Sequence, residues 1–196
     1  METDGAGFPM HERLPDTAYA RLFEQRVVFL RGTIQDSVAD DVAAQLLALD
    51  ARSEEDITLV IDSPGGDVTG IFTIVDTMQT LRSTVHTRCV GLAASAAAVV
   101  LATGTGTRSA TPNSRILLHQ PHGGISGQAK DIEIQAREIA YLRQRLEEIL
   151  AERTKQPIAK IRADTDRDYW LTAEAAKEYG VIDEVLAERT GLHVVR

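Results

Sequence analysis

Short apolar runs alternate with longer segments in which apolar residues recur every three or four positions. The runs predict strands at residues 26–32, 57–61 and 84–90. The longer segments predict amphipathic helices, one capped by Asp36 or Ser37 and the next over residues 68–81. Because strands joined through helices form right-handed crossovers, the alternation predicts an α/β fold with a mainly parallel sheet.

The second half of the chain adds a long helix and several short elements. Residues 108–118 are extended and interrupted by a turn, while residues 130–153 carry apolar residues near heptad spacing and predict the longest helix. We expect this helix to project as an arm, and its apolar seam suits an oligomer interface or an ordinary core cover equally well. The other predicted elements are a helix at 158–163, an acidic turn at 164–168, a helix capped by Thr172 and stopped by Gly180, and a strand at 181–186.

Domain organisation follows from length and from the ends of this pattern. The chain has 196 residues, of which 43% are hydrophobic and 26% charged, as expected for a single globular unit. Residues 1–18 are rich in Gly, Pro, Asp and Glu without periodicity, so we expect a flexible segment there. Residues 19–196 are expected to form one domain.

Charge and cysteine content narrow the classes of function. The net charge of −8 and the absence of a Lys/Arg cluster argue against nucleic-acid binding. A single cysteine, Cys89, lies in an apolar run, which predicts a buried thiol and a reducing compartment. With no apolar stretch of membrane-spanning length and no signal peptide, we expect a cytoplasmic protein that contacts no membrane.

Three predicted strand ends carry residues suited to chemistry. They are Pro64-Gly-Gly66, Ser95 at the start of an Ala-rich helix, and His119 before another glycine-rich turn. Ligands of open α/β sheets sit at such carboxyl ends. Ser95 could be a nucleophile with His119 as its general base, although a small serine in a closely packed helix and a strand-end histidine are also common without chemistry.

Further groups could complete this site. Asp164, Asp166 and Asp168 are alternative carboxylates to orient the imidazole, and sequence spacing does not choose among them. The backbone N–H groups of Gly66 and Ala96 could form an oxyanion hole. The sequence contains no phosphate-binding loop and no metal-ligand cluster, so we expect no metal and no ATP hydrolysis by this chain.

Seven motifs together resemble those of the proteolytic subunit of the Clp ATP-dependent serine protease, over residues 21–186. They are Asp62-Ser-Pro-Gly-Gly66, Asp76-Thr-Met-Gln79, Gly91-Leu-Ala-Ala-Ser95, Pro112-Asn-Ser-Arg115, His119-Gln-Pro-His-Gly-Gly124, Gly127-Gln-Ala-Lys-Asp-Ile-Glu-Ile134 and Asp164-Thr-Asp-Arg-Asp168. The resemblance implies a crotonase-like α/β core with a parallel sheet and a protruding handle helix at about 127–153.

The resemblance also implies a set of roles. Ser95 matches the nucleophile, His119 the general base and Asp168 the orienting acid. Gly66 and Ala96 match the oxyanion-hole donors. The weaker implication is a substrate groove made by four residues: Asp67, Val68, His122 and Gly123.

Assembly and partners are implied in the same way. Members of this family stack two seven-membered rings into a barrel and cleave unfolded proteins inside it. A separate AAA+ unfoldase ring uses ATP to feed them in, so the subunit itself needs no cofactor.

The sequence departs from the family pattern at several positions. Ala96-Ala97 follows the serine in place of Met-Gly, and Thr58 and Val60 stand where aromatic residues usually line the unfoldase docking pocket. The usual N-terminal loop motif is replaced by Pro15-Asp-Thr-Ala18. These changes suggest a paralogous subunit that works in a mixed barrel. Two alternatives are a catalytically idle ring subunit and a crotonase-type enzyme acting on an acyl-CoA thioester.

Overall fold

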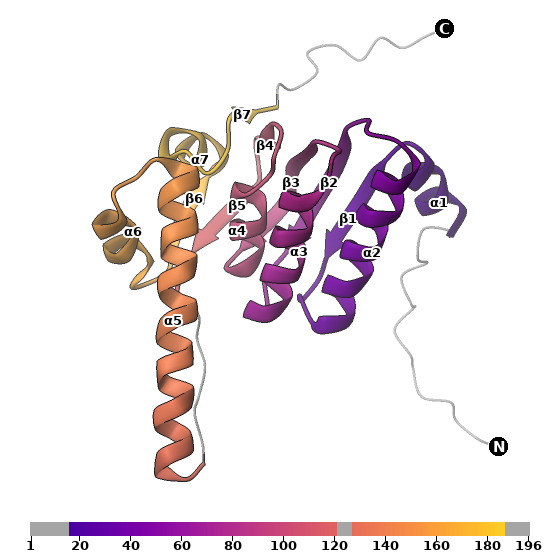
Figure 1. Ribbon diagram of the computed structural model, residues 1–196. Helices are drawn as coiled ribbons and strands as arrows, with labels where there is room; N and C mark the ends of the chain where they lie inside the picture. The colour runs from indigo at the N-terminus through magenta and orange to yellow at the C-terminus, as the bar shows by residue number, and fades with distance from the viewer. Residues whose placement is uncertain (1–15, 121–126, 187–196) are drawn as a thin grey trace, which may run out of the picture.

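The structure is a computed structural model that describes residues 16–120 and 127–186. Helices and strands alternate through most of this length (Figure 1). The helices are α1 (Asp16–Glu24), α2 (Asp36–Arg52), α3 (Val68–Thr80), α4 (Ala96–Ala102), α5 (Ala129–Thr154), α6 (Ile158–Thr165) and α7 (Ala173–Tyr179). The strands are β1 (Val27–Arg31), β2 (Ile57–Ser63), β3 (Val85–Ala94), β4 (Arg108–Ala110), β5 (Arg115–Leu118), β6 (Tyr169–Thr172) and β7 (Glu184–Val185).

One sheet organises the fold, and it is parallel except at β6. Its main order is β1-β2-β3-β4-β7, and every pairing along this path is parallel. The ten-residue β3 has two partners in succession, since β4 lies along its first half and β5 along its second. The last strand, β6, pairs antiparallel with β5. The prediction of an α/β fold with a mainly parallel sheet is therefore confirmed.

Helices α2, α3 and α4 cover one face of this sheet (Figure 1). Alternate residues of β2 are buried under them, with Ile57, Leu59 and Ile61 fully enclosed, because successive side chains of a strand point to opposite faces. All seven residues of the Ala-rich α4 are buried. Small side chains allow that helix to pack closely against the sheet. Because α4 follows β3 directly, its N-terminus lies at the end of the sheet where the parallel strands finish.

Three predictions in the first half of the chain need correction. Helix α1 begins at Asp16, so the predicted flexible segment is wrong for residues 16–18, and residues 1–15 lie outside the described residues. The residue before α2 is Gln35, and its side chain makes no capping hydrogen bond. Strand β3 continues to Ala94 instead of ending at residue 90 as predicted, and the turn into α4 falls at Ser95.

The second half differs from the prediction mainly by one added strand. Residues 169–172 form β6, whereas the sequence pattern predicted no element between the acidic turn and the next helix. Asp164 belongs to α6 rather than to that turn. The cap of α7 agrees with the prediction, because the Thr172 hydroxyl accepts a hydrogen bond from Ala175 N–H at 3.2 Å. Gly180 ends this helix with φ +94°, a conformation that favours glycine.

Helix α5 projects from the body of the molecule (Figure 1). Its C-terminal part is buried through Leu146, Ile149 and Leu150, where it contacts α4 and α6. Toward its other end apolar side chains are exposed, and Ile134 keeps 63% of its surface accessible. None of the helices in the described ranges is long and apolar enough to cross a membrane.

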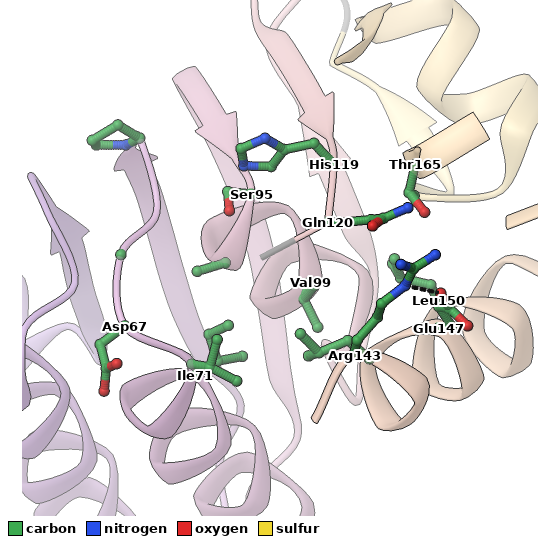
Figure 2. A pocket seen from close by; sticks show the side chains of 15 residues that line it. Asp67, Ile71, Ser95, Val99, His119, Gln120, Arg143, Glu147, Leu150 and Thr165 are labelled. Carbon is green, nitrogen blue, oxygen red and sulfur yellow. Dashed lines mark hydrogen bonds and ion pairs between the residues drawn. The ribbon is translucent and has the colours of Figure 1, made fainter. Parts of the chain in front are cut away.

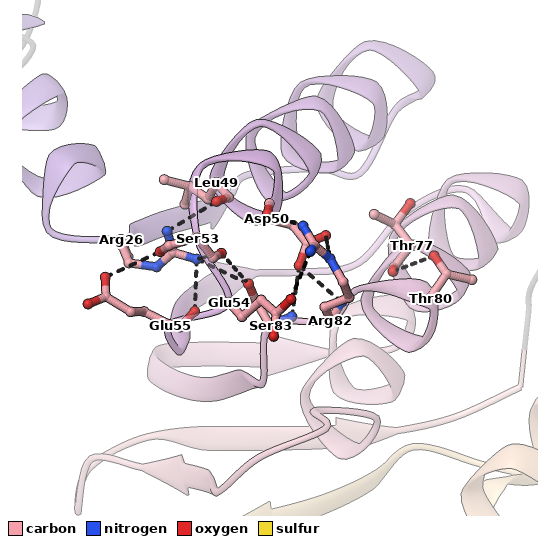
Figure 3. A network of polar contacts seen from close by, with 10 residues as sticks. All are labelled: Arg26, Leu49, Asp50, Ser53, Glu54, Glu55, Thr77, Thr80, Arg82 and Ser83. Carbon is pink, nitrogen blue, oxygen red and sulfur yellow. Dashed lines mark hydrogen bonds and ion pairs between the residues drawn. The ribbon is translucent and has the colours of Figure 1, made fainter.

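A polar network connects the segments at the end of the sheet where the parallel strands begin (Figure 3). The Arg26 guanidinium donates to the carbonyl oxygens of Leu49 and Ser53, each at 3.1 Å, and to that of Glu55 at 2.8 Å. It also donates to the Ser83 hydroxyl at 3.1 Å. One side chain therefore ties the end of α2 and the segment before β2 to the segment before β3.

Candidate active site

The three chemically interesting strand ends lie side by side, as the sequence suggested they would if their strands were neighbours. β3 pairs in parallel with β2 on one side and with β5 on the other. Their carboxyl ends border a pocket of about 360 Å³ that Gly66, Ser95 and His119 all line (Figure 2). Topology thus brings together residues that are far apart in the sequence.

Ser95 occupies a sharp turn between β3 and α4. Its backbone has φ 55° and ψ −121°, a conformation that non-glycine residues rarely adopt. Two hydrogen bonds hold it: its N–H donates to the Leu117 carbonyl at 2.8 Å, and its carbonyl accepts from Ala98 N–H at 3.0 Å. A serine on such a strand-to-helix turn lies at the carboxyl end of its strand, where Ser95 lines the pocket.

The glycine pair after β2 packs directly against this turn. A Cβ atom added at Gly65 would lie 2.5 Å from the Ala94 carbonyl oxygen and 2.8 Å from Ser95 Cβ. It would also lie 2.9 Å from the Ala96 nitrogen. Because Gly65 also has φ +91°, no residue with a side chain fits there without strain.

The Gly66 N–H is directed toward the serine side of the sheet. Gly66 forms a parallel bridge with Ile34, in which Ile34 N–H donates to Gly65 and Asp67 N–H donates to Ile34, both at 2.8 Å. In such a bridge the central residue turns its own N–H away from its partner. Since β1 lies on one side of β2 and β3 on the other, this N–H faces the end of β3.

Ala96 is the second predicted oxyanion-hole donor. It begins α4, and the first N–H groups of a helix have no acceptor within that helix. The structure therefore gathers the N–H groups of Gly66 and Ala96 around Ser95. Their binding of an oxyanion stays a prediction.

His119 lies opposite Asp168 because of the antiparallel pair that the sequence analysis missed. Leu118 pairs with Tyr169 in the antiparallel β5–β6 register. The residue after Leu118 is His119 and the residue before Tyr169 is Asp168, so these two lie opposite each other. Nδ1 of His119 is 3.2 Å from Oδ1 of Asp168. The imidazole is mostly buried, while the carboxylate is more than half exposed.

The other two carboxylates of the acidic motif have different partners. Asp164 accepts a hydrogen bond from the Tyr179 hydroxyl at 2.7 Å and pairs with Lys160. Asp166 accepts one from the Gln120 side chain at 3.2 Å. Among the three candidate carboxylates, Asp168 is the one that the geometry places beside His119.

The remaining predicted residues divide into two groups. Asp67 and Val68 line the pocket at the start of α3. His122 and Gly123 lie outside the described residues.

Cys89 is fully buried as predicted, and burial raises the pKa of its thiol to about 11, so it is poorly suited to act as a nucleophile.

The pocket wall contains a charged cluster that the sequence pattern did not indicate. Glu147 is 5% exposed, and its carboxylate accepts from Arg143 Nε at 2.9 Å and from Arg162 Nε at 2.7 Å. Arg143 and Glu147 both line the pocket. Their i,i+4 spacing is typical of a solvated helix pair, so the sequence carried little signal for this position.

A comparison with known protein families identifies the family of this chain. A family model described as Clp protease matches residues 11–189 of the chain. The matched region contains every residue of the site described above.

Proposed function

The chain belongs to the Clp protease family, and on that premise we propose that it is a serine endopeptidase subunit with Ser95, His119 and Asp168 as its catalytic residues. The observation that carries this proposal is the contact between His119 Nδ1 and Asp168 at 3.2 Å beside the strained Ser95 turn. A histidine held by a carboxylate beside a serine is the arrangement that activates a hydroxyl for acyl transfer.

In the proposed reaction, Ser95 Oγ attacks the carbonyl carbon of the scissile peptide bond. His119 Nε2 takes the hydroxyl proton and then gives it to the leaving amine. Asp168 keeps the Nδ1 proton in place and stabilises the imidazolium. Water, activated by the same histidine, then hydrolyses the acyl-enzyme.

The N–H groups of Gly66 and Ala96 would bind the negative oxygen of each tetrahedral intermediate. The direction of the Gly66 N–H and the helical start at Ala96 support this role. Such donors are worth roughly 3 kcal/mol each in transition-state stabilisation. The donor at Ala96 is a backbone group, so an alanine here supplies the same N–H as any other residue.

Covalent labelling tests the proposal directly. We expect a fluorophosphonate to add once to the wild-type chain, as measured by intact mass, and not to Ser95→Ala. Absence of an adduct both with and without a paralogous subunit would instead favour the idle ring subunit. Hydrolysis of acyl-CoA thioesters with no peptide cleavage would favour the crotonase-type alternative.

We further propose that the chain assembles into stacked rings that receive unfolded proteins from an AAA+ ATPase in the cytoplasm. The exposed apolar side chains on the projecting part of α5 support a self-association surface. Thr58 and Val60, in place of aromatic residues, support a mixed barrel in which another subunit binds the ATPase. The test combines this chain with an ATPase and no second subunit. If that mixture degrades a folded substrate in an ATP-dependent way, the proposal that another subunit must bind the ATPase is wrong.

A further inference from the structure

The pocket beside Ser95 has two unlike parts. Its floor is apolar and is formed by Ile71, Val99, Leu146 and Leu150. At the end farthest from Asp67, the Arg143 guanidinium lies beside Glu147 (Figure 2). A side chain that enters from Ser95 therefore meets apolar surface first and a charged wall beyond it.

The wall belongs to a three-residue cluster with a net positive charge, in which Arg143 and Glu147 line the pocket and Arg162 lies outside its lining. The Arg143 and Arg162 guanidinium groups each bind one oxygen of the buried Glu147 carboxylate, which leaves one positive charge in excess. Glu147 also fixes the direction of Arg143 through its Nε. Within residues 16–120 and 127–186, the terminal nitrogens of Arg143 make no hydrogen bond, so they can bind a ligand.

The other polar groups near this wall are neutral, and each already makes one hydrogen bond. The Gln120 amide donates to Asp166 at 3.2 Å, and the Thr165 hydroxyl donates to the Ile161 carbonyl at 2.8 Å. Asp67, at the opposite end of the pocket, is hydrogen-bonded to the Thr69 hydroxyl. Within the described part of the chain, Arg143 is therefore the charged group of this wall whose terminal N–H donors can bind an entering side chain.

We propose that this pocket selects the substrate residue on the amino side of the cleaved bond (P1), and that Arg143 favours glutamate, then glutamine, over lysine and arginine. The inference rests on the proposed peptidase function. Glutamate and glutamine have an apolar stem that suits the floor and a terminal oxygen that can accept from the guanidinium. A basic side chain would bring a second positive charge to the same wall, which repels it.

The test uses the full-length chain, assembled with any paralogous subunit it requires. Fluorogenic peptides that differ only in P1, with glutamate, glutamine, leucine or lysine, are compared by kcat/KM. In the wild type we expect cleavage after glutamate at least about tenfold faster than after lysine, the ratio that one charge-assisted hydrogen bond would supply. This comparison needs no variant, so it holds whether or not a substituted chain folds.

The variant Arg143→Gln then measures the contribution of the Arg143 side chain to this preference. We expect the ratio of kcat/KM for glutamate to that for leucine to fall about tenfold. Arg145→Gln is the matched control, because Arg145 lies two residues away on α5, pairs with Glu148 and does not line this pocket. It should leave the ratio unchanged.

The outcomes separate the two proposals. Peptide cleavage with the same glutamate-to-leucine ratio in wild type and Arg143→Gln, or lysine cleaved as fast as glutamate, overturns the P1 preference alone. No cleavage of any peptide, with no adduct on Ser95, overturns the peptidase function and the preference together.

Discussion

Ser95 illustrates how a single backbone conformation depends on its surroundings. A serine in isolation would rarely keep φ 55° and ψ −121°, and conformations of this kind cost of order 1–3 kcal/mol. Here β5 accepts its N–H, the first turn of α4 donates to its carbonyl, and Gly65 leaves room beside it. The neighbours that impose this turn are the same ones that border the pocket.

Asp168 is the residue whose role can be separated most cleanly. Asp168→Asn should lower kcat for peptide cleavage by about 10²–10⁴-fold, because the amide no longer stabilises the imidazolium or selects its tautomer. Asp166→Asn is the control, since Asp166 bonds Gln120 instead of His119. Equal losses in the two variants, measured at equal folded fraction, would contradict the assignment.

Cys89 allows a chemical test of burial. Its thiol is fully buried, and that burial raises its pKa to about 11, so very little thiolate forms at pH 8. We expect the native protein to resist a thiol reagent such as DTNB at that pH. The chain unfolded in guanidinium should release one equivalent, and rapid native-state reaction would show that the thiol is accessible.

At the scale of elements, the length of β3 determines where the chemistry lies. Its first half pairs with β4 and its second half with β5, so the strand extends past Val90 and delivers Ser95 next to β5. The antiparallel β6 then brings Asp168 to the end of β5. Strand pairing, rather than loop conformation, therefore sets the order of the three side chains.

Arg26 connects several elements with one side chain (Figure 3). Arg26→Met should lower the free energy of unfolding by about 2–4 kcal/mol, because several backbone carbonyls lose a charged donor. Arg21→Met, at an exposed site on α1, should change it by less than about 0.5 kcal/mol. Urea denaturation of both variants measures these free energies of unfolding. A similar loss in the two variants would contradict the claim that the Arg26 hydrogen bonds stabilise the fold.

The Arg108–Asp183 pair predicts a dependence of stability on pH. Partial burial raises the pKa of the Asp183 carboxyl, but hydrogen bonds from the Arg108 side chain and backbone outweigh burial and lower it below its usual value. A carboxyl with a lower pKa in the folded chain stabilises it above the unfolded pKa of about 3.9. That stability is lost as the pH falls through the folded value.

Asp183→Asn reveals this contribution. The wild type should be more stable than the variant at pH 7, and the difference should persist to about pH 4 and shrink below it. Denaturant unfolding of both proteins across this range is the measurement. A difference that grows as the pH falls would show that the sign is wrong.

At the scale of the whole molecule, α5 combines two environments in one helix. Its C-terminal part belongs to the core and to the pocket wall, while its other part extends away from the sheet with Ile134 and Tyr141 each 63% exposed (Figure 1). Apolar side chains in such a position typically mark a protein–protein interface. The same helix therefore connects the proposed self-association surface to the pocket beside Ser95.

Ile134→Asp tests the assembly surface. We expect the variant to sediment as a smaller species than the wild type, because a charge replaces an apolar contact at the proposed interface. Gln135→Asp, at the adjacent exposed position, introduces the same charge and should keep the wild-type size. Identical size distributions for all three proteins would place the interface elsewhere.

The sequence pattern predicted most of the elements because their apolar periodicity is local. Helix α5 agrees with the predicted range to within one residue at each end, and the cap and end of α7 were read from Thr172 and Gly180. β6 was missed because its four residues show no clear alternation, and they become a strand by pairing with β5.

For the site, the sequence by itself determined which residue types stand at the strand ends: glycines, a serine and a histidine, each beside a turn or a helix start. It left three carboxylates equivalent as partners of His119, because spacing along a chain does not measure distance in space. The family resemblance pointed to Asp168, and the tertiary structure supplies the physical reason, because the β5–β6 register places Asp168 opposite His119. Only the tertiary structure decided that Glu147 and Arg143 line the pocket and that Arg162 binds Glu147 from α6, since these contacts depend on how α5 and α6 pack together and not on the local sequence.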